Sequence, residues 1–412
     1  MDDEAPPNGG LDAKGAVRRP RWGRRTPYGL RRDGPRRDDG RAPAHDKPHD
    51  RPDDRPHDRS PDRHQDQPQN RTQNRPHDRT GEHQNNDHHN ETYAALDLGT
   101  NNCRLLIARP TGNGFRVVDA FSRIIRLGEG IAASRRISEA AIARAVDALS
   151  VCRDKMRARG VLRARLIATE ACRAAENGEA FRTRIAEQAG LELEIVDAAT
   201  EARLAATGCT ELFDPAASGV ILFDIGGGSS ELVRLGRPNG GRRGPPKPDI
   251  IGWSSLPVGV VTLAERYGGH VVSPETYEAM VQEVAGLVAK FAATNSCDLD
   301  GFHMLGTSGT VTTIAGVFLR LKRYDRRRVD GCWLSNEEIS RVVAELMAMS
   351  FDERAANPCI GAERADLVLA GCAILEAIRR AFPCPRLRVA DRGLREGMLV
   401  EMMREDGVWG EA

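Results

Sequence analysis

Two short segments of the chain each place an aspartate next to glycine and small polar residues. Residues 95–106 read Ala-Leu-Asp-Leu-Gly-Thr-Asn-Asn-Cys-Arg-Leu-Leu, and residues 222–233 read Leu-Phe-Asp-Ile-Gly-Gly-Gly-Ser-Ser-Glu-Leu-Val. Each segment predicts a buried strand that reaches an aspartate, turns through glycine and continues as a second strand. Such a turn exposes backbone N–H groups that can hold a phosphate, and the aspartate can hold Mg²⁺.

The two segments indicate an internal duplication. Asp97 and Asp224 are 127 residues apart, which is about one domain length. A plain β-hairpin would account for either segment alone. Two copies at this spacing favour a pair of turns that face each other across a cleft and hold a phosphate from both sides.

A third glycine-rich segment covers residues 305–313 and reads Leu-Gly-Thr-Ser-Gly-Thr-Val-Thr-Thr. Its position predicts the end of a strand and the start of an apolar helix. Free N–H groups at a helix N-terminus attract anions. By itself the segment favours a plain capped helix start, but beside the other two turns it indicates part of the same site.

These motifs resemble those of the exopolyphosphatase and guanosine-pentaphosphate phosphohydrolase (Ppx/GppA) family. Further similar segments are Arg-Leu-Gly-Glu-Gly at 126–130, Glu-Ala-Arg-Leu at 201–204, Leu-Pro-Val-Gly at 256–259 and Gly-Leu-Arg-Glu-Gly at 393–397. The resemblance covers residues 93 to about 402. Sugar kinases, actin and heat-shock ATPases share the fold and the two phosphate turns but lack the Glu-Ala-Arg-Leu segment.

The resemblance implies an α/β architecture, the two-domain actin-like ATPase (ribonuclease H-like, ASKHA) fold. We expect a first domain at 93–215 and a second at 216–402, with a closing helix that could pack back on the first domain and a short tail at 403–412. The chain resembles the short form of the family, which has no additional C-terminal helical domain.

The resemblance also assigns roles to the matching residues. Glu201 is expected to be the base that deprotonates the attacking water, with a helix-capping glutamate as the alternative. The family usually carries a second acid beside this residue, where this chain has Thr200. Asp224 and Glu231 are expected to hold Mg²⁺, with Asp97 as a possible third ligand.

Phosphate binding is expected from glycines, small polar residues and two arginines of the three turns and their surroundings. An arginine suits this task because its planar fork bonds phosphate oxygens in pairs, although a surface ion pair is the alternative for each. The expected residues are Gly99, Thr100, Asn101, Arg104, Arg173, Gly226, Gly227, Gly228, Ser229, Ser230, Gly306, Thr307, Ser308, Gly309 and Thr310. Arg126 and Arg395 are weaker candidates, and neither His270 nor His303 is assigned to a metal.

The expected reaction is hydrolysis of the terminal phosphoanhydride of inorganic polyphosphate, of guanosine pentaphosphate, or of both. The phosphate turns do not distinguish these substrates. An actin-fold kinase that uses ATP is the first alternative, but the sequence gives no clear adenine-binding signal. A non-catalytic sensor of guanosine tetra- or pentaphosphate is the second, but Glu201 and Asp224 are both intact.

Composition separates residues 1–92 from the rest of the 412-residue chain. They hold 19 basic and 18 acidic residues and 8 of the 10 histidines, whereas the remainder holds 41 of each charge. So few aliphatic side chains predict a disordered tail. Ten basic residues and one acid lie between Lys14 and Arg37, where a weak polyanion-binding arm is an alternative to a solvated leader.

Other features bear on where the protein works. Nine cysteines without a Cys-x-x-Cys pair predict reduced thiols in a cytoplasmic protein. The longest apolar stretch is too short to span a bilayer, and the N-terminus does not resemble a secretory signal. We further expect a homodimer. Apolar spacing predicts helices over 138–159, 179–188, 201–208, 274–292, 335–349 and 363–380.

Overall fold

The computed structural model describes residues 91–238, 244–296 and 298–410. All of them lie in one compact unit formed by residues 76–412. The predicted disordered tail at 1–92, apart from its last two residues, lies outside the described residues. The same holds for the proposed polyanion arm at 14–37.

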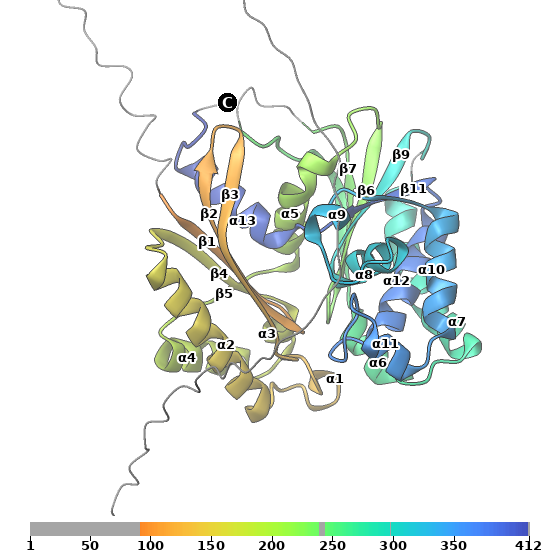
Figure 1. Cartoon of the computed structure of the whole chain (residues 1–412), viewed down its shortest axis with the longest axis horizontal. Helices are drawn as coiled ribbons and strands as arrows, with labels where there is room; N and C mark the ends of the chain where they lie inside the picture. The colour runs from red at the N-terminus through yellow and green to blue at the C-terminus, as the bar shows by residue number, and fades with distance from the viewer. Residues whose placement is uncertain (1–90, 239–243, 297, 411–412) are drawn as a thin grey trace, which may run out of the picture. The chain divides into compact units, whose positions relative to one another are not determined.

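The first sheet has five strands in the order β3-β2-β1-β4-β5 (Figure 1). Strands β1, β2 and β3 form an antiparallel meander, and β4 and β5 continue the sheet in parallel with β1. The strands are β1 Tyr93–Leu98, β2 Asn102–Thr111, β3 Gly114–Ile124, β4 Arg163–Ala168 and β5 Glu194–Ile195. One face packs on α2 (Glu139–Ala158) and α4 (Gly178–Ala189), whose buried residues share a core with β1 and β2.

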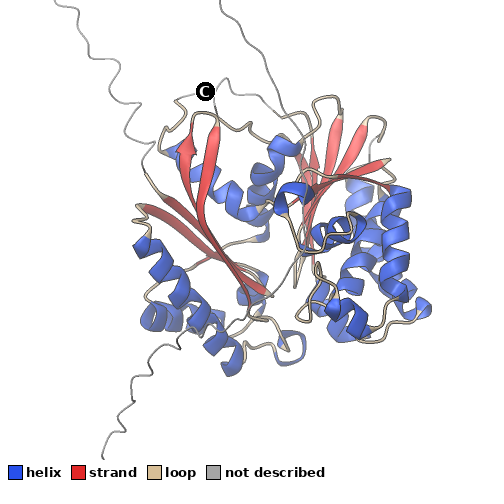
Figure 2. Cartoon of the chain, in the orientation of Figure 1, coloured by secondary structure: helices blue, strands red, loops and turns tan. Residues whose placement is uncertain are grey.

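The second sheet has six strands in the order β10-β11-β9-β6-β7-β8 (Figure 2). The strands are β6 Gly219–Ile225, β7 Ser230–Leu235, β8 Ile250–Leu256, β9 Phe302–Thr307, β10 Trp333–Ser335 and β11 Arg386–Ala390. Again three strands form an antiparallel meander, β6 to β8, and two follow in parallel, β9 and β11. The second sheet thus repeats the order of the first and adds β10, which confirms the duplication.

The largest core covers one face of the second sheet, where helices from α6 to α12 pack against the strands. These helices are α6 Val260–Tyr267, α7 Pro274–Thr294, α8 Gly309–Phe318, α10 Asn336–Ala348, α11 Phe351–Ala356 and α12 Val368–Ala381. The short helical segments are α1 Ile131–Ser134, α3 Glu170–Ala174, η2 Thr210–Leu212 and α9 Arg326–Val329.

Helices α5 (Ala198–Cys209) and α13 (Leu394–Glu405) lie between the two sheets (Figure 1). Helix α13 shares a core with the first sheet, and α5 contributes to a core with the second. The two helices touch at glycine: a Cβ on Gly397 would lie 2.0 Å from the Leu204 carbonyl oxygen, and one on Gly208 2.0 Å from that of Gly393. This contact explains both glycines, because any side chain would push the helices apart.

Most predicted elements are present, with shifted ends. Helix α2 begins after Ser138, whose hydroxyl accepts a hydrogen bond from the Ala141 N–H at 3.2 Å. The helix predicted over 363–380 begins only at Val368, because residues before it form turns. Instead of a tail from residue 403, α13 continues to Glu405, and Val408 and Trp409 are buried.

No helix in the described part of the chain has the length and apolar character needed to cross a membrane. Eight of the nine cysteines are described, and all eight are free thiols.

Candidate active site

A cleft of about 740 Å³ lies between the two sheets, where β1, β6 and β9 end and α5, α8 and α13 begin. Its wall contains most of the predicted site residues: Asp97, Gly99, Thr100, Asn101, Arg104, Glu201, Asp224, Gly226, Gly227, Gly228, Ser229, Glu231, Thr307, Ser308, Gly309 and Thr310. The fold therefore brings together three turns that are distant in sequence. Arg173, Ser230 and Gly306 are not part of this wall.

The first two glycine turns touch each other across the cleft. A Cβ on Gly227 would lie 2.9 Å from the Thr100 Cβ, and one on Gly228 would lie 3.0 Å from the Thr100 hydroxyl oxygen. Glycine is needed at both positions because the turn from the other sheet occupies the space of a side chain. A small anionic group in the cleft would therefore meet both turns at once.

The Leu-Pro-Val-Gly segment supports the second turn from behind. A Cβ on Gly259 would lie 2.3 Å from the Gly227 carbonyl carbon. The first N–H groups of α6, from Val260 and Val261, donate to the carbonyls of Gly226 and Gly227 at 2.9 Å each. These bonds tie the carbonyls of the second turn to the start of α6.

The third turn joins β9 to α8 through a strained residue. Ser308 has φ 115° and ψ 174°, a backbone conformation found almost only in glycine. Its hydroxyl accepts a hydrogen bond from the Thr310 N–H at 3.2 Å. Strain of this kind persists where the surroundings impose it, and here it turns the start of α8 toward the cleft.

Three carboxylates line the cleft where the first two glycine turns meet. Asp224 and Glu231 are directly opposite each other on β6 and β7, and Asp97 holds the equivalent place to Asp224 on β1. Burial, and then the charge of Asp97, raise the pKa of Asp224 to about 6. Burial also raises the pKa of Glu231 and of Asp97. These acids repel one another and lack a nearby cation strong enough to offset their burial.

This set of donors fits a hard divalent cation. It consists of carboxylate oxygens, which Mg²⁺ prefers, and a bound cation would relieve their repulsion. Within the described residues, no group of three or more acidic, histidine or cysteine side chains is close enough to ligate one metal together. Mg²⁺ usually uses one or two carboxylates and takes its remaining ligands from water and phosphate, which is consistent with this spacing.

Glu201 lies in the first turn of α5 and is 6 % exposed. Asp197 caps the helix by accepting a hydrogen bond from the Thr200 N–H at 2.8 Å. The Arg173 guanidinium forms an ion pair with Oε2 of Glu201. Burial and repulsion by Glu231 outweigh Arg173 and raise the pKa of the Glu201 carboxyl, which suits a group that takes up a proton.

Three partly buried arginines without acidic partners line the cleft with these carboxylates: Arg104, Arg364 and Arg395. None of them forms an ion pair within the described residues. The Arg364 guanidinium donates only to backbone carbonyls, those of Ile360 and Cys359 at 3.0 and 3.2 Å. Burial, and then in part the charge of Arg104, lower the pKa of both Arg364 and Arg395. An anion would relieve this repulsion.

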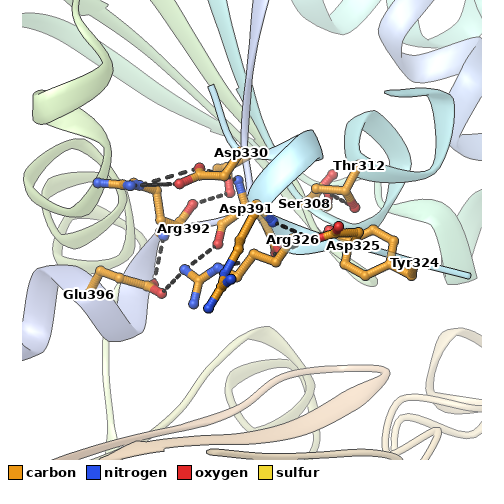
Figure 3. Close-up of polar contacts among 12 residues, drawn as sticks. Ser308, Thr312, Tyr324, Asp325, Arg326, Asp330, Asp391, Arg392 and Glu396 are labelled. Atoms are coloured by element: carbon orange, nitrogen blue, oxygen red, sulfur yellow. Dashed lines mark hydrogen bonds and ion pairs between the residues drawn. The ribbon is translucent and has the colours of Figure 1, made fainter. Parts of the chain in front are cut away.

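A polar network fixes the loop between β11 and α13 at the edge of the cleft (Figure 3). Arg326 donates to the Asp391 carbonyl at 2.6 Å and to the Glu396 carboxylate at 2.9 Å. Arg392 is paired with Asp330 at 2.6 Å, and its carbonyl accepts a hydrogen bond from the Thr307 hydroxyl at 2.6 Å. The network thus ties the start of α13 to the third turn.

Some predicted residues have other contacts. The Arg173 guanidinium is occupied by Glu170, Glu201 and the Val196 carbonyl. The Ser230 hydroxyl donates to the Val258 carbonyl at 2.7 Å, and a Cβ on Gly306 would meet Phe223 at 2.6 Å. Sequence reasoning missed Arg364, which lies outside the three glycine turns of the site. Its only signal is a lone arginine before an apolar helix.

Comparison with known proteins agrees with this geometry. Residues 106–406 match the model of the Ppx/GppA phosphatase family. The chain belongs to this family. The match covers far more than half of the chain and confirms the resemblance that the glycine turns indicate.

Among solved structures, the Aquifex aeolicus member of the Ppx/GppA family has 25 % sequence identity and a TM-score of 0.63, over 77 % of this chain and 98 % of that one. The actin-like fold is therefore confirmed.

Two curated relatives differ in how much of their length the chain spans. Exopolyphosphatase 2 of Mycobacterium tuberculosis is 27 % identical over 324 residues, which is 75 % of this chain and 98 % of the relative. Guanosine-5'-triphosphate,3'-diphosphate pyrophosphatase of Photobacterium profundum is 25 % identical over 76 % of this chain. The chain spans only 59 % of that longer relative.

Proposed function

We propose that the protein hydrolyses the terminal phosphoanhydride bond of inorganic polyphosphate, of guanosine pentaphosphate, or of both. The observation that carries the proposal is the composition of the cleft wall. Three glycine turns are joined there by the carboxylates of Asp97, Asp224 and Glu231 and by Arg104, Arg364 and Arg395, which form no ion pair within the described residues. A terminal phosphoryl group needs both partners, since its oxygens are anionic and its leaving group gains charge.

In this mechanism the backbone N–H groups of the turns hold the terminal phosphoryl group. Glu201 accepts a proton from a water molecule as the water oxygen forms a bond to the terminal phosphorus. The bond from that phosphorus to the bridging oxygen breaks, and the chain leaves shortened by one phosphate. The arginines of the cleft stabilise the charge on the leaving oxygens.

Asp224 and Glu231 would hold Mg²⁺, with Asp97 close by. When bound, Mg²⁺ would neutralise charge on the phosphoryl oxygens. Arg173 is assigned a different role from the one expected, because its guanidinium is occupied by two glutamates and a carbonyl. It positions the Glu201 carboxylate instead of gripping phosphate.

Two comparisons support the hydrolase over the kinase and the sensor. The named relatives are an exopolyphosphatase and a guanosine pentaphosphate pyrophosphatase. The chain spans nearly all of the exopolyphosphatase but only part of the second relative, which favours polyphosphate as the first substrate to test. The buried, proton-accepting Glu201 gives a hydrolase its base.

The test is phosphate release from polyphosphate, guanosine pentaphosphate and ATP side by side, each with and without Mg²⁺. We expect Mg²⁺-dependent release from at least one of the first two and little from ATP. Glu201→Gln should keep binding and lose about 10²- to 10⁴-fold in turnover, as removal of a general base does. Unchanged turnover in Glu201→Gln, or metal-independent release, would contradict the mechanism.

A further inference from the structure

The segment between α8 and β10 is unusually basic. Six of the nine residues at 320–328 are lysine or arginine, and the only acid among them is Asp325. Two of the cations are paired, Arg320 with Glu345 at 2.6 Å and Arg326 with Glu396 at 2.9 Å. The other four are Lys322, Arg323, Arg327 and Arg328, which we call the basic rim.

All four side chains of the basic rim are exposed. None forms an ion pair or a side-chain hydrogen bond with any residue that the structure describes, whereas most arginines of the two sheets do. Like charges this close repel one another. An exposed cluster without internal compensation is suited to a polyanion, which would replace that repulsion by attraction.

The basic rim is continuous with the cleft. Tyr324 and Arg326, which lie between the two pairs of rim residues along the chain, both line the cleft. Figure 3 shows Arg326 directed toward Asp391 and Glu396 at the start of α13. From the first sheet, Ser122 and Arg123 of β3 also line the cleft. A linear ligand that leaves between β3 and α9 therefore passes the basic rim.

We propose that the basic rim binds inorganic polyphosphate beyond the terminal units held in the cleft, and so selects long chains over short substrates. The proposal rests on the proposed function. Polyphosphate carries a negative charge on every unit, so a chain that extends past Arg326 meets several rim cations in succession. Guanosine pentaphosphate has no such extension and gains nothing from these residues.

The rim chemistry favours polyphosphate over single-stranded nucleic acid. Proteins that bind single strands combine basic residues with exposed aromatic rings on which bases stack. The one aromatic residue in the segment is Tyr324, which is half-buried and donates its hydroxyl proton to Asp391 at 2.8 Å. Among the described residues, the large aromatic side chain exposed to solvent is Trp253, on the edge strand β8.

The test uses two full-length variants with the same change in charge. The rim variant carries Lys322→Gln, Arg323→Gln, Arg327→Gln and Arg328→Gln. The control variant carries Arg136→Gln, Arg157→Gln, Lys247→Gln and Lys290→Gln, four exposed cations that do not line the cleft. Both keep residues 1–92, so any contribution of the N-terminal segment cancels. Equal melting temperatures would show that neither set disturbs the fold.

Two measurements are made: the KM and kcat for phosphate release, and the binding of end-labelled long-chain polyphosphate by fluorescence anisotropy. For the rim variant at low salt we expect KM and Kd for long chains to rise about tenfold or more, since several phosphate contacts are lost. The dependence of log Kd on log salt should become shallower by about 2–3, at ~0.7 per contact. Kinetics on guanosine pentaphosphate and tripolyphosphate should change less than about twofold, as should every value for the control variant.

Each outcome decides the proposal. Equal long-chain Kd values for wild type, rim variant and control would overturn it. So would a rim variant that loses binding of a labelled oligouridylate of equal charge but keeps its polyphosphate affinity, because the rim would then serve RNA. If wild type binds polyphosphate through the rim but releases no phosphate from it, the binding proposal stands and the proposed hydrolysis fails.

Discussion

The guanidinium of Arg173 lies against the carboxylate of Glu201 and is itself held from two further sides. Nη1 donates to the Val196 carbonyl at 2.7 Å, and Nη2 donates to Glu170 at 2.7 Å. An arginine bound in this way cannot turn into the cleft without breaking several hydrogen bonds. Its position instead fixes one oxygen of the candidate base.

Arg173→Ala should therefore lower kcat more than it raises KM. We expect a loss of about 10²-fold in kcat, in the range of a general-base contribution, with KM changed by less than about threefold. Removal of the cation should also raise the pKa of Glu201 further, so the acidic limb of the pH profile of kcat/KM should move to higher pH.

Arg173→Lys provides the matched comparison. A lysine keeps the charge but loses the planar fork that bonds two glutamates and a carbonyl together. In Arg173→Lys, the acidic limb of the pH profile of kcat/KM should stay near its wild-type position, and kcat should recover only in part. If Arg173→Ala raised KM but left kcat and the acidic limb of the pH profile unchanged, Arg173 would bind phosphate instead.

Asp224→Asn should stabilise the protein while it abolishes activity. The pKa of Asp224 is raised to about 6 by burial and by Asp97, so the folded state holds its proton more tightly than the unfolded chain does. For such a group, stability falls as pH rises from about 4 to about 6 and stays lower above that range. The asparagine removes this penalty, which corresponds to about 1–3 kcal/mol.

Melting temperatures at pH 4 and pH 8 check this prediction. The variant should match wild type at pH 4 and exceed it by a few degrees at pH 8. Mg²⁺ should narrow the difference, because a cation bound by wild type offsets the same repulsion. The control is Asp147→Asn, an exposed residue of α2, which should show neither effect. A variant less stable than wild type at pH 8 would contradict the argument.

Ser308→Gly should stabilise the fold through the backbone. Ser308 adopts φ 115° and ψ 174°, a conformation that costs a non-glycine residue roughly 1–3 kcal/mol. Loss of its cap to the Thr310 N–H costs only a few tenths of a kcal/mol when glycine replaces serine. Urea unfolding should show that Ser308→Gly gains about 1 kcal/mol in the free energy of unfolding.

The control is Ser308→Ala, which keeps the backbone strain and loses the cap, so it should be less stable than wild type by about 1 kcal/mol. Equal stability of the two variants would show that the strain is absent.

The glycine turns and their aspartates could be predicted because the chemistry is local. Asp97 and Asp224 lie within a few residues of the glycines that form their turns, and the duplication repeats the pattern. The strand order of the second sheet repeats the first for the same reason. The strand–turn–strand unit is encoded by consecutive residues and needs no knowledge of the rest of the chain.

Arg364 and the role of Arg173 could not be predicted in this way. Arg364 reaches the cleft because residues 361–367 form turns before α12 begins, whereas apolar spacing alone extends that helix back to 363. Arg173 looks like a cation free to bind phosphate until Glu170 and Val196 are found around it. The role of Arg173 depends on Val196 and Glu201, which are distant from it in sequence, and the turns that place Arg364 leave no mark in the apolar spacing.

Arg126 connects the first glycine turn to the second sheet's helices. Its guanidinium forms two hydrogen bonds with the Asp366 carboxylate, at 3.0 and 3.1 Å, and a third with the Glu363 carbonyl at 3.1 Å. Its own N–H donates to the Asn101 carbonyl at 3.1 Å. Asp366 is two residues from Arg364, so this ion pair links two parts of the proposed phosphate site.

Replacing Arg126 should weaken substrate binding, and two replacements separate the ion pair from the backbone. Arg126 has φ 46°, a left-handed conformation that costs non-glycine residues about 1–2 kcal/mol. Both Arg126→Ala and Arg126→Gly remove the ion pair with Asp366, but only glycine adopts the left-handed backbone conformation without strain. Arg126→Gly should therefore be more stable than Arg126→Ala by about 1 kcal/mol. Both should raise KM by a similar factor, and adding Asp366→Ala to either should raise it little further, because the partners act as a unit. Additive effects on KM in the double variant would show that the pair does not link the two sides of the cleft.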